Sequence, residues 1–454
     1  MIEQEIERKI GDFRELGLPS YFPRNGRIHS VDYMVSTIIG ARRSGKSFRM
    51  IQEASEWLEQ KKIQSINHIC RLDFDNPILS GLKANELSLI QSTFLKLTPD
   101  VNLKTPLLFL LDEIHKIQGW EEYVIDLSRN PHWKVVVSGS SSKMLSQDIA
   151  TELRGKAIST NLFPLSFAEF LTFKKSKQNP STKGQAETRR LFDEYLAWGA
   201  YPAIANLDKY LREPILREYF DTMILKDIIQ RYNVSKPQQC IQLCRYLLAN
   251  IGKPYTLQSA YRYLKQSGYA TSKDAIRNYI GWSEDSWLLF SIPIFSDSLK
   301  EQERNYKKLY AIDWALANKN SQVWDGGRSR ALENMIFLHL RRNWPRVHYY
   351  LTGKKRQEVD FIVADNNGTP IMALQVCLDI SEKNTIQREL DSLAVTANYF
   401  KTKINLIITY NQAGDFCVNS VNIKAVPAWK WLLGNGAMGS DLIALENVKT
   451  MVIE

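Results

Sequence analysis

The residues from Gly40 to Ser47 follow the spacing Gly-x-x-x-x-Gly-Lys-Ser, which predicts a loop that holds the phosphates of ATP. Gly40 and Gly45 let backbone N–H groups turn toward phosphate, at the positive end of a following helix. Lys46 would reach the β- and γ-phosphates, and the Ser47 hydroxyl would ligate Mg²⁺. The expected nucleotide-binding residues are Gly40, Ala41, Arg42, Arg43, Ser44, Gly45, Lys46, Ser47 and Phe48.

Two adjacent acids, Asp112 and Glu113, end the apolar run PLLFLLDE. A buried parallel strand would deliver Asp112 to the Mg²⁺ shell and Glu113 to a water that faces the γ-phosphate. The pair favours hydrolysis over simple binding, with Glu113 and Lys46 as catalytic residues. The alternative is a strand that merely ends in acidic surface residues.

A later strand, WKVVVSG, runs into a group of serines. Ser138, Ser140 and Ser141 could sense the γ-phosphate, or they could cap the next helix. Arg154, in TELRGKA, could act as a catalytic arginine finger on its own nucleotide or on that of a neighbouring subunit, which would imply a homo-oligomer. A solvated arginine is the alternative. The sequence decides neither between the two roles of the serines nor between the two roles of Arg154.

Five blocks between Ile38 and Leu171 carry a resemblance to a known family. They are IIGARRSGKS, LLFLLDEIHKIQGW, VVVSGSSSKML, LRGKA and FPLSFAEFL. In this order they resemble the prokaryotic AAA+/STAND-related P-loop ATPases. The resemblance implies an ATP-hydrolysing switch, commonly followed by a winged helix and a nuclease-like domain. The last block carries no obvious chemistry and is expected to be a packing element.

The elements that position the phosphate loop follow from apolar patterning. A buried strand over Tyr33–Ile39 leads into the loop, and a helix is expected from about Gly45. The lysine-rich stretch from Phe173, with Pro180 and Gly184, predicts an exposed loop. Helical patterning resumes in LFDEYLAWGAYPAI and LREYFDTMILKDIIQRY, which would form a helical lid.

Three helices and two strands after residue 236 predict a winged helix-turn-helix. The first helix ends at Gly252, Thr256 can cap the second, and Ser272 can cap the third. Strands are expected around Leu288–Phe295 and Lys308–Ile312, with SDSLKEQERNY between them as the wing.

On double-stranded DNA, the third of these helices would enter the major groove with Lys273, Arg277 and Asn278 near its start. The acids Asp274, Glu284 and Asp285 on the same helix count against that contact. Packing of the winged helix against the ATPase core is the alternative.

The C-terminal third has the order helix, three strands, helix, strand, which resembles the PD-(D/E)xK nuclease fold. The stretches are RALENMIFLHLRRNW, VHYYLTG, EVDFIVA, IMALQVCL, KNTIQRELDSLAVTANYF and INLIITY. Active members of that family need carboxylates for Mg²⁺ and a lysine at the attacking water.

Glu333 and Asp360 match the carboxylate positions of that family, but its Glu-x-Lys is replaced by Gln375-Val376-Cys377. A neutral amide is a poor Mg²⁺ ligand, and a thiol supplies no positive charge. The resemblance therefore implies a degenerate nuclease site that survives as a binding or docking module.

Lys354 or Lys355, on the loop before Asp360, could replace the missing lysine. In that case the domain would be an ATP-regulated nuclease.

The composition sets the broad class. The 454 residues are 44% hydrophobic and 24% charged, with a net charge of +10 that permits, without requiring, a polyanionic partner. The apolar runs are too short for a membrane span, and the N-terminus has no apolar signal core. Five scattered cysteines fit a reducing compartment, so we expect a cytoplasmic protein without membrane contact.

The predicted fold class is α/β, with a P-loop AAA+-like core, a helical lid, a winged helix and a restriction-endonuclease-like domain. The expected division is 1–172, 173–235, 236–322 and 323–454. The favoured function is an Mg²⁺-dependent ATP-binding and hydrolysing switch that acts on DNA. The alternatives are an ATP-gated module for a protein partner, with no nucleic-acid role, and an ATP-regulated DNA nuclease.

Overall fold

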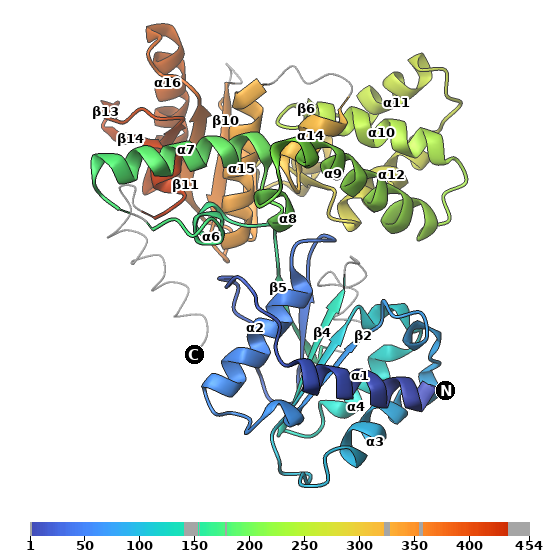
Figure 1. The fold of residues 1–454 in the computed structure, drawn as a ribbon. Helices are drawn as coiled ribbons and strands as arrows, with labels where there is room; N and C mark the ends of the chain where they lie inside the picture. The colour runs from blue at the N-terminus through green and yellow to red at the C-terminus, as the bar shows by residue number, and fades with distance from the viewer. Residues whose placement is uncertain are drawn as a thin grey trace. The chain divides into compact units, whose positions relative to one another are not determined.

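The chain forms two compact units of α/β structure in a computed structural model (Figure 1). The described residues are 2–139, 153, 155–177, 179–321, 327–353 and 357–434. Unit 1 holds Met1–Pro164 with Asp285–Trp287, and unit 2 holds Leu165–Glu284 with Leu288–Glu454. Within the described ranges, every helix falls short of the length and apolarity that a bilayer crossing requires.

Unit 1 is built on a five-stranded parallel sheet with the strand order β2-β3-β4-β1-β5. The strands are β1 (Val35–Ile39), β2 (Ile69–Asp73), β3 (Leu107–Asp112), β4 (Trp133–Gly139) and β5 (Ala157–Asn161). β1, β3 and β4 are buried along their whole length, which explains their near-continuous apolar sequences. Parallel pairing brings the carboxyl ends of all five strands to one edge of the sheet.

Helices complete the core of unit 1. They are α1 (Ile2–Leu16), α2 (Lys46–Glu59), α3 (Ser88–Lys96) and α4 (Trp120–Leu127). Phe13 of α1 and Met50 of α2 pack in one buried cluster with Ile38, Leu108 and Val136 of three strands. This packing fixes the first turn of α2 against the strand that precedes the phosphate loop.

Unit 2 begins with helices. They are α6 (Phe167–Phe173), α7 (Thr182–Trp198), α8 (Pro202–Ala205), α9 (Lys209–Thr222) and a π-helical continuation of α9 over Met223–Gln230. The prediction of an exposed loop from Phe173 is wrong beyond residue 181. Ser181 accepts a hydrogen bond from the Gly184 amide and starts a helix whose first two turns are polar because they face solvent.

A small antiparallel sheet follows in unit 2, with the order β6-β8-β7. Its strands are β6 (Pro254–Tyr255), β7 (Leu289–Ile292) and β8 (Lys307–Ala311), and its helices are α10 (Pro237–Ala249), α11 (Leu257–Gln266) and α12 (Lys273–Asp285). Thr256 caps α11, and Ser272 accepts from the Ala275 amide at the start of α12, as predicted. The segment expected as a wing contains a short helix, α13 (Leu299–Arg304), capped by Ser298.

The rest of unit 2 carries a six-stranded mixed sheet with the order β13-β14-β12-β11-β10-β9. Its elements are α14 (Trp314–Asn320), α15 (Gly327–Asn343), β9 (Arg346–Leu351), β10 (Glu358–Ala364), β11 (Pro370–Cys377), α16 (Lys383–Phe400), β12 (Ile404–Thr409), β13 (Gly414–Val418), β14 (Val421–Pro427) and α17 (Ala428–Trp431). The predicted order of one helix, three strands, one helix and one strand is confirmed for α15 to β12.

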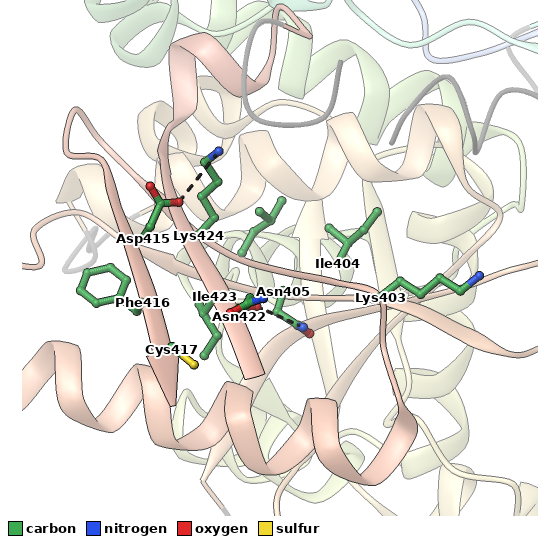
Figure 2. A pocket seen from close by; sticks show the side chains of 10 residues that line it. Lys403, Ile404, Asn405, Asp415, Phe416, Cys417, Asn422, Ile423 and Lys424 are labelled. Atoms are coloured by element: carbon green, nitrogen blue, oxygen red, sulfur yellow. Dashed lines mark hydrogen bonds and ion pairs between the residues drawn. The ribbon is translucent and has the colours of Figure 1, made fainter. Parts of the chain in front are cut away.

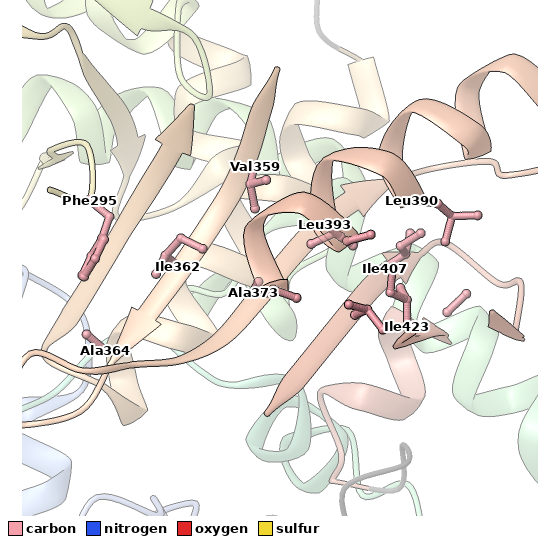
Figure 3. Close-up of a cluster of buried hydrophobic side chains, with 13 residues drawn as sticks. Phe295, Val359, Ile362, Ala364, Ala373, Leu390, Leu393, Ile407 and Ile423 are labelled. Carbon is pink, nitrogen blue, oxygen red and sulfur yellow. The ribbon is translucent and has the colours of Figure 1, made fainter. Parts of the chain in front are cut away.

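The core of this sheet lies under α16. Leu390 and Leu393 of α16 pack with Val359 and Ile362 of β10 and with Ile407 of β12 (Figure 3). Apolar residues at helical spacing on α16 and at alternate positions on β14 account for this layer. On β10 the register shifts between Val359 and Ile362, and both side chains belong to the layer. The other face of these strands is also largely apolar, since Phe361 of β10 and Met372 and Leu374 of β11 are fully buried.

Candidate nucleotide site and an acidic cluster

The predicted phosphate loop joins β1 to α2 in unit 1. Gly45 has a left-handed conformation, with φ of 100°, and caps α2 directly before Lys46. Arg43, also left-handed with φ of 66°, bends the loop two residues earlier. The Lys46 ammonium lies 3.2 Å from the carbonyl oxygens of both Gly40 and Ala41, so its side chain folds over its own loop.

Both glycines stand where a larger side chain would collide. A Cβ at Gly40 would lie 2.1 Å from the Leu162 carbonyl oxygen, and one at Gly45 would lie 3.0 Å from an Arg24 nitrogen. The buried Ser44 Oγ has no hydrogen-bond partner among the described residues. A close backbone loop with an unsatisfied buried hydroxyl fits the oxygen-rich phosphates of a nucleotide.

Arg24 supports this loop and was not predicted from the sequence. Its guanidinium donates to the Ser44 carbonyl at 2.6 Å and to the Phe163 carbonyl at 2.7 Å. Its backbone amide donates to the Gln52 side chain at 2.8 Å. Arg24 has no local sequence signal, because Ser44, Gln52 and Phe163 lie 20 to 139 residues further along the chain.

Asp112 lies at the carboxyl end of β3 and is 2% exposed. Its carboxylate accepts hydrogen bonds from the hydroxyls of Ser138 and Ser47. Burial raises the pKa of Asp112, and these two hydrogen bonds oppose that shift. Ser138, which is fully buried, therefore orients the carboxylate. Ser47 and Asp112 are brought together as the prediction of a shared Mg²⁺ site requires.

Glu113 follows with a left-handed backbone, φ 56°, which is uncommon for a residue with a side chain. Its amide donates to Ser138 Oγ at 3.1 Å. One carboxylate oxygen lies 3.6 Å from Lys46 Nζ, and the other lies 3.5 Å from His115 Nδ1. The turn thus directs Glu113 toward the phosphate loop.

A third acid, Asp73, ends the neighbouring strand and was missed in the sequence. Its strand partner is Asp112, and the Phe74 amide donates to the Asp112 carbonyl at 3.0 Å. Burial raises the pKa of Asp73, and the charge of Glu113 adds to that shift. The sequence signal that could have revealed Asp73 is its place as an acid at the end of the strand ICRLD.

Several predicted residues fall outside the described part of the chain. They are Ser140, Ser141, Arg154, Lys354 and Lys355.

In unit 2, Glu333 of α15 and Asp360 of β10 are brought together around a lysine that was not predicted. Lys308 Nζ of β8 lies 2.7 Å from Glu333 Oε1, 2.9 Å from Glu358 Oε1 and 3.2 Å from Asp360 Oδ1. We call these four side chains the acidic cluster. The alternation of Lys308 with Tyr310, and of Glu358 with Asp360, was the available sequence signal.

Gln375 and Cys377 lie beside the acidic cluster without facing Lys308. Gln375 accepts from the Asp360 amide at 2.8 Å and donates to the Glu358 carbonyl at 3.0 Å and to the Glu389 carboxylate. The Cys377 thiol donates to the Asp379 carbonyl at 3.1 Å. Gln375 therefore ties β10, β11 and α16 together, and Cys377 contributes no group to the cluster.

The pKa values of Glu333, Glu358 and Lys308 are raised by their surroundings. Burial raises the pKa of Glu333 to about 7, with the charge of Lys308 opposing. Burial alone would favour the neutral amine of Lys308, but the negative charges of its neighbours raise its pKa well above the usual value. Lys308 therefore remains a cation near neutral pH.

A cavity of about 460 Å³ lies elsewhere on the six-stranded sheet, where β12 and the β13–β14 hairpin diverge (Figure 2). Lys403, Asn405, Phe416 and Lys424 are among its lining residues. Its lining contains none of the site residues predicted from the sequence.

Comparison with known proteins gives two matching family models. Residues 32–171 match the model of an AAA domain, which spans the phosphate loop, Asp112 and Glu113. Residues 189–324 match a domain of unknown function, and this range includes Lys308. The AAA match identifies the parallel-sheet unit as a P-loop ATPase domain.

A walker-type ATPase of Pyrococcus abyssi is similar at 12% identity, over 70% of this chain and 96% of that chain, with a TM-score of 0.38. A score this low does not establish a common fold over the aligned length. An uncharacterized protein of Haemophilus influenzae is 28% identical over 371 residues, 82% of this chain and 88% of that protein.

An uncharacterized protein of Methanocaldococcus jannaschii is 30% identical over 424 residues, 90% of each chain. Similarity over this length extends into both units of the structure. With its AAA domain at residues 32–171, the chain therefore belongs to the same family as the M. jannaschii protein.

Proposed function

We propose that this protein is an Mg²⁺-dependent ATPase whose nucleotide state switches the conformation of its C-terminal part. The observation that carries the proposal is the hydrogen-bonded group at the sheet edge. Asp112 accepts from Ser47 of the phosphate loop and from Ser138 of β4, while Glu113 faces Lys46. A hydroxyl, a buried carboxylate, a lysine and a second carboxylate are the groups that ATP hydrolysis requires.

Each residue has a separate role in this proposal. Ser47 and Asp112 would hold Mg²⁺, which neutralises phosphate charge when it is bound. Lys46 exchanges its carbonyl contacts for phosphate oxygens, because an ammonium binds a charged phosphate oxygen more strongly than a neutral carbonyl. Glu113 orients and deprotonates the attacking water, and Ser138 holds Asp112 and the Glu113 amide in place.

The test is steady-state ATP hydrolysis and ATP binding by the full chain. Lys46→Ala should abolish binding or hydrolysis, whereas Lys104→Ala, which removes an exposed lysine of the same unit, should leave both unchanged. Full turnover by the Lys46→Ala variant would refute the site. The proposed role of Arg154 would be tested by Arg154→Ala mixed with Glu113→Gln protein, since rescue on mixing requires a finger from another subunit.

DNA as the target is supported by charge and by the arrangement of elements. We infer that residues 236–322 form a winged helix, with α10, α11 and α12 as its helices, followed by a degenerate nuclease-like domain at 323–454. Residues 1–172 and 173–235 are the ATPase core and the lid. Lys273, Arg277 and Asn278 are exposed on α12, and the net charge is +10.

One observation favours the second candidate, a switch that binds a protein partner and no nucleic acid. Arg277 is paired with Asp274 at 2.6 Å, which reduces the positive charge available at the start of α12. A DNA shift assay over a series of salt concentrations separates the two functions. A shift that weakens steeply with salt and is lost in Lys273→Ala supports DNA binding, whereas no shift at low salt supports the protein partner.

A further inference from the structure

Lys308 has an environment unlike that of an ordinary buried residue. Its side chain is 1% exposed, and its ammonium is enclosed by carboxylates from two elements, α15 and β10. An ammonium has three N–H donors, and three different carboxylate oxygens lie within hydrogen-bond distance of it. Every donor of Lys308 is thereby satisfied without water.

The surrounding groups hold the carboxylates in this arrangement. Tyr310, two residues along β8, donates to the same Glu333 oxygen at 2.8 Å. The Val376 amide donates to the other Asp360 oxygen at 2.9 Å. Gly252 leaves room for Glu333, since a Cβ there would lie 3.0 Å from Glu333 Oε2. The carboxylates therefore converge on one point, which the Lys308 nitrogen fills.

Carboxylates that converge on one point are the usual ligand set of a hard divalent cation. In metal-dependent hydrolysis, a lysine beside such a cation acts on the water, while the carboxylates hold the metal. Here the lysine nitrogen itself stands at the point of convergence. In this arrangement neither the acidic cluster nor any other group of three His, Cys, Asp or Glu side chains among the described residues is placed to hold a metal ion.

We propose that Lys308 is a resident cation that takes the place of a divalent metal in the acidic cluster and closes the cluster to metal. It follows that Glu333, Glu358 and Asp360 form a concealed divalent-cation site, which opens only when the Lys308 charge is removed or β8 withdraws. This inference does not depend on ATP hydrolysis and can fail or succeed independently of it.

The experiment is Mn²⁺ binding to the nucleotide-free full chain, measured by the loss of the free Mn²⁺ paramagnetic resonance signal. We expect no tight binding by the unmodified protein and about one Mn²⁺ per chain for Lys308→Met. The matched control is Lys307→Met, which removes the adjacent lysine that pairs with exposed Glu303. Lys308→Met combined with Asp360→Asn should lose the gained site.

Two results would overturn the proposal. One is tight Mn²⁺ binding by the unmodified protein that disappears with Asp360→Asn, or Mn²⁺-dependent plasmid cleavage that disappears with the same change. The other is a folded Lys308→Met protein, judged by circular dichroism, that binds no Mn²⁺.

A second measurement needs no substitution and keeps the proposal testable if Lys308→Met does not fold. The native protein is treated with an amine-acetylating reagent, and the labelled lysines are identified by mass spectrometry. Lys307 should be acetylated at least about tenfold faster than Lys308, because an enclosed ammonium is neither accessible nor neutral. Equal labelling of the two lysines would show that the cluster is not closed.

Discussion

Lys46 and Lys308 each face carboxylates, but the two ammonium groups are held in different ways. Lys46 lies 3.6 Å from a single carboxylate, that of Glu113, and contacts the carbonyls of its own loop at 3.2 Å. Lys308 contacts three carboxylates between 2.7 and 3.2 Å. A lysine beside acids therefore makes a responsive site, as at the phosphate loop, only when the lysine can still attract and bind another anion.

The largest effect is expected at the responsive site. Glu113→Gln keeps the size of the side chain and removes its basicity, so ATP hydrolysis should fall by about a thousandfold while ATP binding persists. The measurement is single-turnover hydrolysis beside equilibrium binding, with the exposed Glu15→Gln as control. Hydrolysis within a factor of about two of the unmodified protein would remove Glu113 from the mechanism.

Substitution of Lys308 should affect mainly stability, whereas substitution of Lys46 should affect mainly ATP hydrolysis. Lys308→Met leaves three partly buried carboxylates without their cation and should lower the free energy of unfolding by about 2 kcal/mol, with ATP hydrolysis unchanged. Lys46→Met should abolish hydrolysis and alter stability by less than about 1 kcal/mol. Chemical denaturation and ATPase assays on both variants check this. Equal destabilisation by the two substitutions would contradict the comparison.

Gly40→Ala should damage the phosphate loop through backbone contact. The added methyl would meet the Leu162 carbonyl 2.1 Å away, and that carbonyl cannot move without disturbing β5. We expect a loss of about 2 kcal/mol in stability and weaker ATP binding. Gly11→Ala, at an exposed helix position with nothing nearby, is the control and should be neutral or slightly stabilising. A fully active Gly40→Ala protein would show that this close approach is absent.

Ser138→Ala should have a smaller effect on the responsive site. It removes the hydroxyl that donates to Asp112 and accepts from the Glu113 amide, so the hydrolysis rate should fall by about tenfold. Because that hydrogen bond opposes the upward shift, its loss should also raise the pKa of Asp112 further. An unaltered rate would mean that Asp112 does not need this support.

The phosphate loop and its acids could be predicted because each signal is contiguous. Residues 40–47 form one loop, and Asp112 and Glu113 end one apolar run, so local spacing was enough. The α15 to β12 order was likewise predictable from periodicity. The alternation of apolar and polar residues in Val421–Pro427, facing Gly414–Val418 across the turn Asn419–Ser420, would also have revealed the terminal hairpin.

The remaining features depend on contacts between distant residues. Lys308 meets its partners 25 to 52 residues further along the chain. The local alternation of Lys308 with Tyr310 places both side chains on one face of a strand, but it does not identify the carboxylates that they meet. Arg24 is similar, since it reaches Phe163, 139 residues away. The start of α7 was mispredicted for another reason. A solvent-facing, lysine-rich helix has the composition of a loop, and only the Ser181 cap distinguishes the two.

The hydrogen bonds of Gln375 constrain how this sequence can change over evolutionary time. Its amide nitrogen is a donor to Glu389, so Gln375→Glu alone would place two carboxylates in contact within a buried layer. A carboxylate at 375 becomes tolerable only after Glu389 has been replaced. The effect of a glutamate at position 375 thus depends on whether Glu389 has already changed, so the order of substitutions matters.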